Sequence, residues 1–130
     1  MKLLLTVHVT LSEPCTVTGG AKGVVMIPFT GYAEGDYFNG EIIGTGVDTQ
    51  MIEKDHLVSL SARYMLAGRD HTGEECRIFI ENNGSSPDHC IPALVTDSRA
   101  LAAWQQASLV SRVTPAEKGV TVEIFDAAKS

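Results

Sequence analysis

Apolar and polar residues alternate over several short stretches of the chain, which is the period-two pattern of half-buried β-strands. In the first stretch Val7 and Val9 share one face. Residues 12–23 contain Ser, Pro, Thr and Gly and predict a loop. Outside the central region, the predicted strands cover residues 2–10, 24–32, 91–95, 109–113 and 120–125.

A glycine-dense segment, residues 31–46, follows the second predicted strand and has the sequence GYAEGDYFNGEIIGTG. Single glycines within a β pattern mark bends and bulges, and repeated bends let a sheet coil into a barrel. Asn39-Gly40 is a strong hairpin-turn pair, and we expect a turn there. Pro28 lacks an N–H donor and predicts a bulge or an edge in its strand.

The clearest supersecondary signal is a hairpin over residues 57–84 with its turn at Asp70-His71-Thr72-Gly73. Asp at the first position and Gly at the fourth favour a type I turn followed by a left-handed glycine, which gives a three-residue loop. Paired residue numbers then sum to 144, which places Arg63 opposite Glu81. This register predicts one apolar face, formed by Leu60, Ala62, Tyr64, Leu66, Cys76, Ile78 and Ile80.

The remaining pattern predicts one short helix over residues 98–106, with Thr96 or Asp97 as its N-cap. Leu101 and Trp104 share one face of this helix. Seven or eight short strands with one helix indicate an all-β fold, either a barrel or a sandwich. The glycine bends favour an antiparallel β-barrel, and the 130-residue length predicts that residues 1–130 form a single domain.

Composition excludes some functional classes. The formal net charge is −6 and the ten basic residues are scattered, which argues against binding to nucleic acids and anionic membranes. The odd set Cys15, Cys76 and Cys90 predicts reduced thiols rather than a disulfide framework. The first residues, MKLLLTVH, are too short an apolar run for a signal peptide, and no apolar run reaches membrane-spanning length. We therefore expect a cytoplasmic protein.

No single motif identifies a chemistry. The four histidines form no ligand pair with metal-binding spacing, so we expect no metal and no cofactor. Asp88-His89-Cys90 brings three reactive residue types together. Adjacent residues do not normally converge on one metal or form a nucleophile with its base, and a surface turn is the simpler interpretation.

Two polar groups are candidate sites. Asp48 and Gln50 follow a glycine bend, where a carboxylate could line a barrel mouth as a base or acceptor, or simply cap the turn. Arg63 and Glu81 share a polar face that either meets solvent or lines a wet cavity. Trp104 either closes one barrel end over a ligand or anchors the core.

Several segments resemble a known family. These are GEIIGTGVDTQ, Asp55, SARYMLAGRDHTG and IENNG, together with Pro92, Thr96, Trp104 and the closing VTVEIFDA. In this order they resemble the family called domain of unknown function 3237, over roughly residues 3–127. The resemblance implies a compact antiparallel barrel of streptavidin- or lipocalin-like kind and no established activity. The matched positions are Gly40, Gly44, Asp48, Gln50, Arg63, Tyr64, Asp70, Gly73, Asn82 and Gly84. The chain departs from the family in a short loop at residues 85–90 and in Thr72 of the central turn.

Three hypotheses remain open. The first is a small-molecule-binding barrel, with the ligand contacted by Gln50, Tyr64, Glu81 and Trp104. The second is an enzyme that acts on a small organic substrate by proton transfer, with Asp48 as base and Arg63 holding an anion on the same cavity. The third is a non-catalytic assembly protein, such as a homo-oligomer, with a filled barrel and an exposed apolar patch.

Overall fold

The computed structural model describes residues 1–130 and contains nine β-strands and one short 3-10 helix. The strands are β1 (Lys2–Leu11), β2 (Cys15–Thr18), β3 (Lys22–Glu34), β4 (Phe38–Glu53), β5 (His56–Asp70), β6 (Glu75–Gly84), β7 (Cys90–Thr96), β8 (Leu109–Ala116) and β9 (Gly119–Asp126). The helix, η1, covers Ala102–Gln106. The expected all-β, antiparallel architecture is confirmed.

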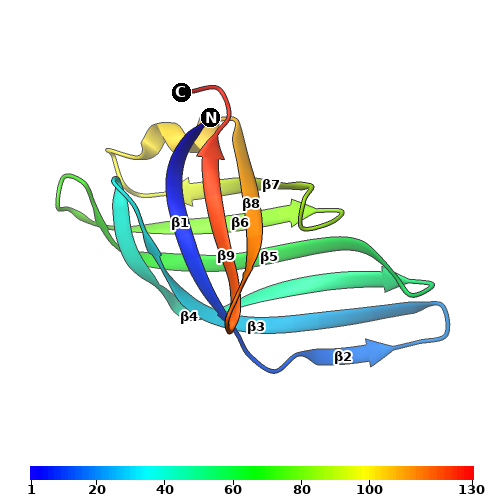
Figure 1. The fold of residues 1–130 in the computed structure, drawn as a ribbon. Helices are drawn as coiled ribbons and strands as arrows, with labels where there is room; N and C mark the ends of the chain where they lie inside the picture. The colour runs from blue at the N-terminus through cyan, green and yellow to red at the C-terminus, as the bar shows by residue number, and fades with distance from the viewer.

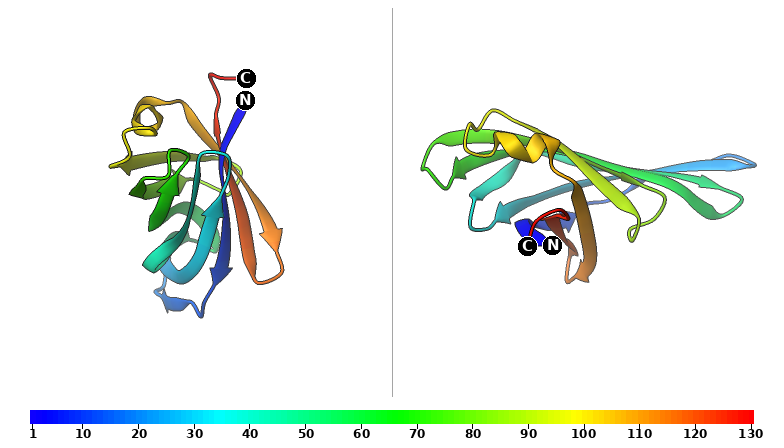
Figure 2. Two further views of the ribbon diagram at one scale, coloured as in Figure 1. Left: turned by 90° about the vertical axis from the view of Figure 1, so that its left-hand side faces the viewer. Right: turned by 90° about the horizontal axis from the view of Figure 1, so that it is seen from above.

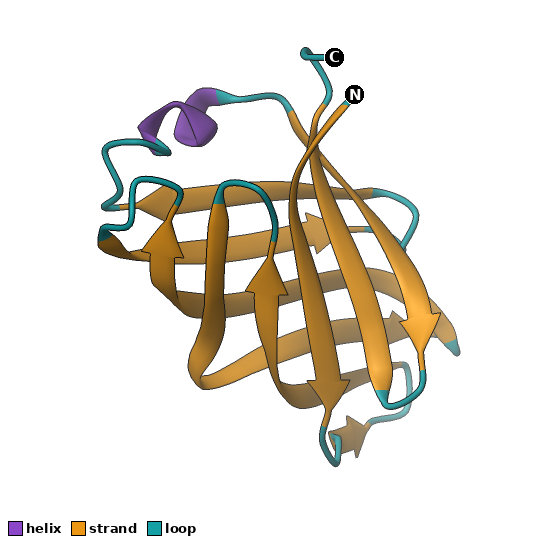
Figure 3. Cartoon of the chain, turned by 60° about the vertical axis from the view of Figure 1, so that its left-hand side comes forward, coloured by secondary structure: helices purple, strands orange, loops and turns teal.

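All nine strands form one curled antiparallel sheet, in the order β7-β6-β5-β4-β3-β1-β9-β8 with β2 added to β3. Strands β1, β9 and β8 cross in front of β5, β6 and β7 at a steep angle (Figures 1 and 3). The ladder does not continue from β7 to β8, so the barrel has one seam. The connection through η1 bridges that seam at the end where the two chain termini lie side by side (Figures 1 and 2).

The curl arises where the glycine-dense segment was expected to bend the sheet. The pairing of β3 with β4 shifts between Phe29 and Tyr32, and the pairing of β4 with β5 shifts between Ile43 and Val47. Gly44 has a φ of 64°, a conformation that favours glycine. Both strands therefore bend at the same level of the sheet, which turns it into a half-barrel.

Pro28 lies where β3 changes partners. Residues 23–26 of β3 pair with β2, whereas residues 29–34 pair with β1. Because Pro28 falls between these two ladders, its missing N–H interrupts neither. The proline thus lies where β3 has an unpaired edge between β2 and β1, while its pairing with Val47 of β4 continues on the other side.

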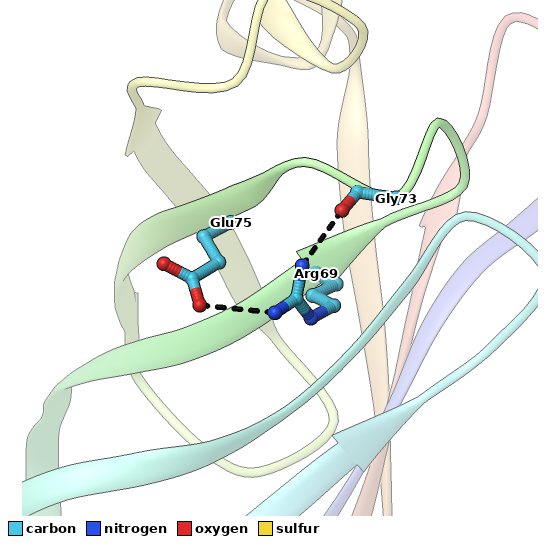
Figure 4. A network of polar contacts seen from close by, with 3 residues as sticks. All are labelled: Arg69, Gly73 and Glu75. Carbon is cyan, nitrogen blue, oxygen red and sulfur yellow. Dashed lines mark hydrogen bonds and ion pairs between the residues drawn. The ribbon is translucent and has the colours of Figure 1, made fainter.

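The central hairpin has the predicted register, with every pair from Leu60↔Gly84 to Arg69↔Glu75 summing to 144. The amide of Gly73 donates to the carbonyl of Asp70 at 2.9 Å, and Gly73 has a φ of 88°. On the outer face of this end, Arg69 donates to the Gly73 carbonyl at 2.9 Å and to Glu75 at 3.0 Å (Figure 4). Hydrogen bonds within residues 69–75 therefore hold both the turn and the adjoining ends of the two strands.

Three sequence-based expectations were wrong in detail. Asn39-Gly40 lies inside β4 rather than in a turn, because Gly40 faces Gly68 where the strands approach closely. The predicted loop at 12–23 contains β2, and the predicted helix at 98–106 shortens to the single 3-10 segment η1. Leu101, which precedes η1, is fully buried in the core, as its pattern predicts.

The ends of β2, β3, β4 and β5 extend well beyond the curled part of the sheet (Figure 2). Exposed apolar side chains occur on this extension, at Val17, Met26, Met51, Leu57 and Val58.

The structure contains no helix with the length and apolar character needed to cross a bilayer.

Candidate functional site

The inner face of the curled sheet forms a partly open cavity of about 170 Å³. Fifteen residues line it and eleven of them are hydrophobic, contributed mainly by β1, β3, β5 and β9. The polar contribution is small and comes from three strands, with Asp48 and Gln50 from β4, Tyr64 from β5 and Asn82 from β6. The cavity therefore has the composition of a small-molecule site, largely apolar with a few polar groups.

One row of paired residues runs across the cavity wall. Asp48 pairs with Ala62, and Ala62 pairs with Asn82 on its other side. Since residues paired across neighbouring strands point to the same face of a sheet, all three side chains point inward. The small Ala62 side chain leaves space between the two polar groups, which flank it as a carboxylate and an amide.

Asp48 is the most unusual group in this row. Its Oδ2 accepts a hydrogen bond from Gln50 Nε2 at 3.0 Å, whereas its Oδ1 is buried and accepts none. Burial raises the pKa of the Asp48 carboxyl, and the Gln50 hydrogen bond opposes this rise. A buried acceptor without a partner costs free energy, so this carboxylate is held in place at the expense of stability.

Aromatic and sulfur groups complete the wall. The rings of Phe29 and Tyr64 meet edge to face with centroids 5.5 Å apart. Complete burial raises the pKa of the Tyr64 hydroxyl, so Tyr64 is a neutral donor at physiological pH. Burial and the charges of Asp48 and Asp88 raise the pKa of the Cys90 thiol, which donates to the Ser86 carbonyl at 3.1 Å. Cys90 is therefore a protonated thiol rather than an activated nucleophile.

Asn82 also connects the cavity to the seam of the barrel. Its Nδ2 donates to the hydroxyl of Ser111 in β8 at 3.1 Å, which links β6 to the opposite end of the sheet order. The β6–β7 loop lies at the same end of the barrel, where Pro87 contributes to the cavity wall. The seam and this loop are therefore the parts of the wall with no backbone ladder to hold them.

The structure separates the predicted site residues into two groups. Asp48, Gln50 and Tyr64 line the cavity. Arg63 and Glu81 form an ion pair at 3.0 Å on the outer face of the hairpin, where the Arg63 side chain is 64% exposed. The structure therefore does not bring Arg63 and Asp48 together, because alternate residues of a strand point to opposite faces.

Trp104 lies away from the cavity. Its ring contacts Tyr37 edge to face at 6.0 Å and packs against the core at the η1 end of the barrel. The residues of the Asp88-His89-Cys90 triplet also diverge. The exposed His89 ring is hydrogen-bonded to Ser86 at 2.9 Å, whereas Cys90 points inward.

Sequence reasoning did not single out Asn82, Cys90 or Phe29 as part of this wall, nor Ser111 as the partner of Asn82. For Asn82 the signal was present in the predicted register, since 82 and 62 sum to 144 and Ala62 was assigned to the apolar face. For Ser111 no such signal existed, because its contact with Asn82 crosses the seam and depends on how far the sheet curls.

Comparison with known proteins agrees with this fold. Residues 1–115 match the family model described as protein of unknown function, DUF3237. The chain belongs to this family. A UPF0311 protein from Clostridium acetobutylicum is 32% identical over 98 residues, which cover 70% of this chain and 58% of that protein. The chain thus matches less than two thirds of the length of this curated relative.

Three solved structures share the fold, each matching 95% of this chain. A protein of unknown function from Clostridium acetobutylicum has a TM-score of 0.78 at 23% identity, with 93% of its chain covered. A conserved protein of unknown function from Rhodopseudomonas palustris has a TM-score of 0.67 at 15% identity, also with 93% covered. An enzyme from Penicillium herquei has a TM-score of 0.69 at 13% identity, with 92% covered.

Proposed function

We propose that this protein binds a small molecule inside its curled sheet, with Asp48 as the main polar anchor. The observation that carries the proposal is the buried Oδ1 of Asp48, which has no hydrogen-bond partner at the wall of an apolar cavity. Buried polar atoms in folded proteins are almost always paired. A ligand that donates a hydrogen bond to Asp48 would supply the missing partner.

The shape of the interior supports this proposal over a filled barrel that serves only for assembly. An assembly protein has no need for an internal cavity, whereas Asp48 and Asn82 lie on the wall of one cavity, on either side of the small Ala62. The exposed apolar residues on the strand extension remain compatible with association of copies. Such association would be an additional property of the protein rather than a competing one.

Proton transfer to or from a bound substrate is the second candidate. The raised pKa of Asp48 favours it, because a carboxyl group shifted toward neutrality is a better general base. The fold likewise accommodates catalysis, since the similar structure from Penicillium herquei is that of an enzyme. The outer-face position of Arg63 does not support its predicted role as an anion holder. Because Asn82 is hydrogen-bonded to Ser111, Tyr64 is the lining residue that offers a donor to a substrate.

Native mass spectrometry of the protein as purified tests the proposal. We expect a reproducible extra mass on the wild-type chain that is lost in Asp48→Leu and retained in Glu81→Gln, a matched charge removal on the outer face. Solvent extraction and mass analysis would then identify the bound compound. If no extra mass is found and a broad library of small molecules produces no thermal shift, the proposal is wrong.

A further inference from the structure

The charges that line the cavity limit what it can hold. None of the fifteen lining residues is Lys, Arg or His, and the only carboxyl group among them is that of Asp48. An anionic ligand would meet a carboxylate in an apolar surrounding with no cation to balance it, which is strongly unfavourable. Carboxylates and phosphates are thereby excluded as ligands of this cavity.

The size of the cavity sets a second limit. A cavity of about 150 Å³ accepts benzene in another protein. At about 170 Å³ this cavity holds a single six-membered ring with one small substituent. The wall around it consists largely of Val, Leu and Ile side chains with the rings of Phe29 and Tyr64, so the body of the ligand is a hydrocarbon.

The hydrogen-bonding groups determine the substituent. Asp48 offers a free acceptor at Oδ1, and Gln50 already occupies Oδ2. Asn82 is engaged with Ser111. Tyr64 is a neutral donor on the same wall, and a hydroxyl oxygen and a carbonyl oxygen both accept from it, so Asp48 makes the distinction between them. A hydroxyl group satisfies the free acceptor at Asp48 without the cost of desolvating a second charge. An ammonium group would incur that cost even when it pairs with the carboxylate.

We propose that the cavity selects an uncharged compound of about one ring in size, mostly hydrocarbon, which donates a single hydroxyl to Asp48. This inference rests on the proposed function and narrows it to one ligand class. It separates neutral alcohols from ketones, amines and acids with the same carbon skeleton.

Four probes with one six-membered ring test the inference: cyclohexanol, cyclohexanone, cyclohexylamine and cyclohexanecarboxylate. Their dissociation constants are measured at pH 7.5 by protein-observed NMR titration, on the wild-type chain, Asp48→Leu and the outer-face control Glu81→Gln. We expect cyclohexanol to bind about tenfold more tightly than cyclohexanone, the difference of one hydrogen bond to a charged acceptor. The carboxylate should not bind.

Leu matches Asp closely in shape but accepts no hydrogen bond. In Asp48→Leu the preference for the alcohol over the ketone should fall about tenfold, and in Glu81→Gln it should not change. Equal binding of alcohol and ketone in the wild-type chain overturns the choice of ligand class, and so does tighter binding of the amine or the carboxylate. If no probe shifts the resonances of cavity residues, the proposed function fails as well. If Asp48→Leu does not fold, the order of the four dissociation constants in the wild-type chain still tests the inference.

Discussion

Asn82 and Ser111 join two strands that the sheet itself leaves unjoined. The Asn82 amide donates to the Ser111 hydroxyl at 3.1 Å, and the Asn82 carbonyl lies 3.4 Å from the same hydroxyl. Ser111 belongs to β8, the edge strand on one side of the sheet, and Asn82 belongs to β6, which lies next to the other edge strand, β7. A pair of side chains therefore closes the barrel where no backbone ladder does.

Replacing Ser111 with Ala should lower the free energy of unfolding by about 1 to 3 kcal/mol, because the buried Asn82 amide would lose its partner. Chemical denaturation measures this change. Thr114→Ala, an exposed position on the same strand, is the control and should change stability by less than about 0.5 kcal/mol. Equal effects of the two substitutions would show that the seam contact contributes nothing specific.

Asp48→Asn should stabilise the ligand-free protein at neutral pH by on the order of 1 kcal/mol, since it removes a buried charge. The pKa of Asp48 is raised in the folded state, so its protonated form favours folding. That contribution is present below about pH 3.8 and is lost as the pH rises through the folded-state pKa. Melting temperatures between pH 3.5 and 8 should therefore show the advantage of Asn only in the upper part of the range. An advantage that does not depend on pH would rule out this cause.

Ala62→Leu should fill the space between Asp48 and Asn82 and abolish ligand binding while leaving the fold intact. Filling a cavity commonly adds stability, here up to about 1 kcal/mol. Ala93→Leu adds the same side chain on the outer face of β7 and should leave binding unchanged. Native mass spectrometry and thermal unfolding of both variants check the pair, and unchanged binding by Ala62→Leu would place the ligand elsewhere.

Gly46→Ala should displace the ring of Phe29, which is part of the cavity wall. A Cβ at this position would lie 2.4 Å from the ring of Phe29, so the ring must move, at about 1 to 3 kcal/mol. Gly44→Ala meets no neighbouring atom and costs only the strain of a positive φ, about 1 kcal/mol. Titration with cyclohexanol should show weaker binding for Gly46→Ala than for Gly44→Ala. Indistinguishable affinities would mean that Phe29 does not shape the site.

Asp70 should control stability in acid. Hydrogen bonds from the hydroxyls of Ser98 and Thr72 hold the pKa of Asp70 at about 2, against an ordinary value of 3.8. Its contribution is present above pH 3.8 and is lost as the pH falls through 2. Asp70→Asn should therefore be less stable than wild type at pH 6, with the gap closing toward pH 2. A gap of constant size across this range would contradict the role of the charge.

The register of the central hairpin was predictable because turn chemistry and side-chain pattern agree. Asp70 and Gly73 specify the loop, and the alternation of polar and apolar residues independently places Tyr64 and Arg63 on opposite faces. The sequence left open which face points inward, and the structure shows that it is the face of Tyr64. The same logic misassigned Asn39-Gly40, because a glycine serves equally in a turn and at a close approach between strands. Only the structure shows that a Cβ on Gly40 would lie 2.4 Å from the carbonyl oxygen of Ala67.

The candidate site was predictable only in part, for a related reason. Position along a strand tells which face a side chain takes, and this sufficed for Asp48 once its pairing with Ala62 was known. It does not tell at which level of the barrel a cavity remains. The position of the cavity depends on the combined volume of side chains that are far apart in sequence. The sequence therefore could not show that Asp48 lines the cavity while Trp104 packs elsewhere.

The turn at Asp70–Gly73 lies eight residues from Ala62, about 26 Å along an extended strand at about 3.3 Å per residue. If the loop keeps its three residues, one residue inserted there shifts the pairing of β6 by one and exchanges its two faces, turning Asn82 outward and Glu81 inward. Loops normally tolerate insertions and deletions. Here the interior of the barrel constrains the length of a distant loop. In homologous sequences we therefore expect this turn to keep its number of residues even where its residue types change.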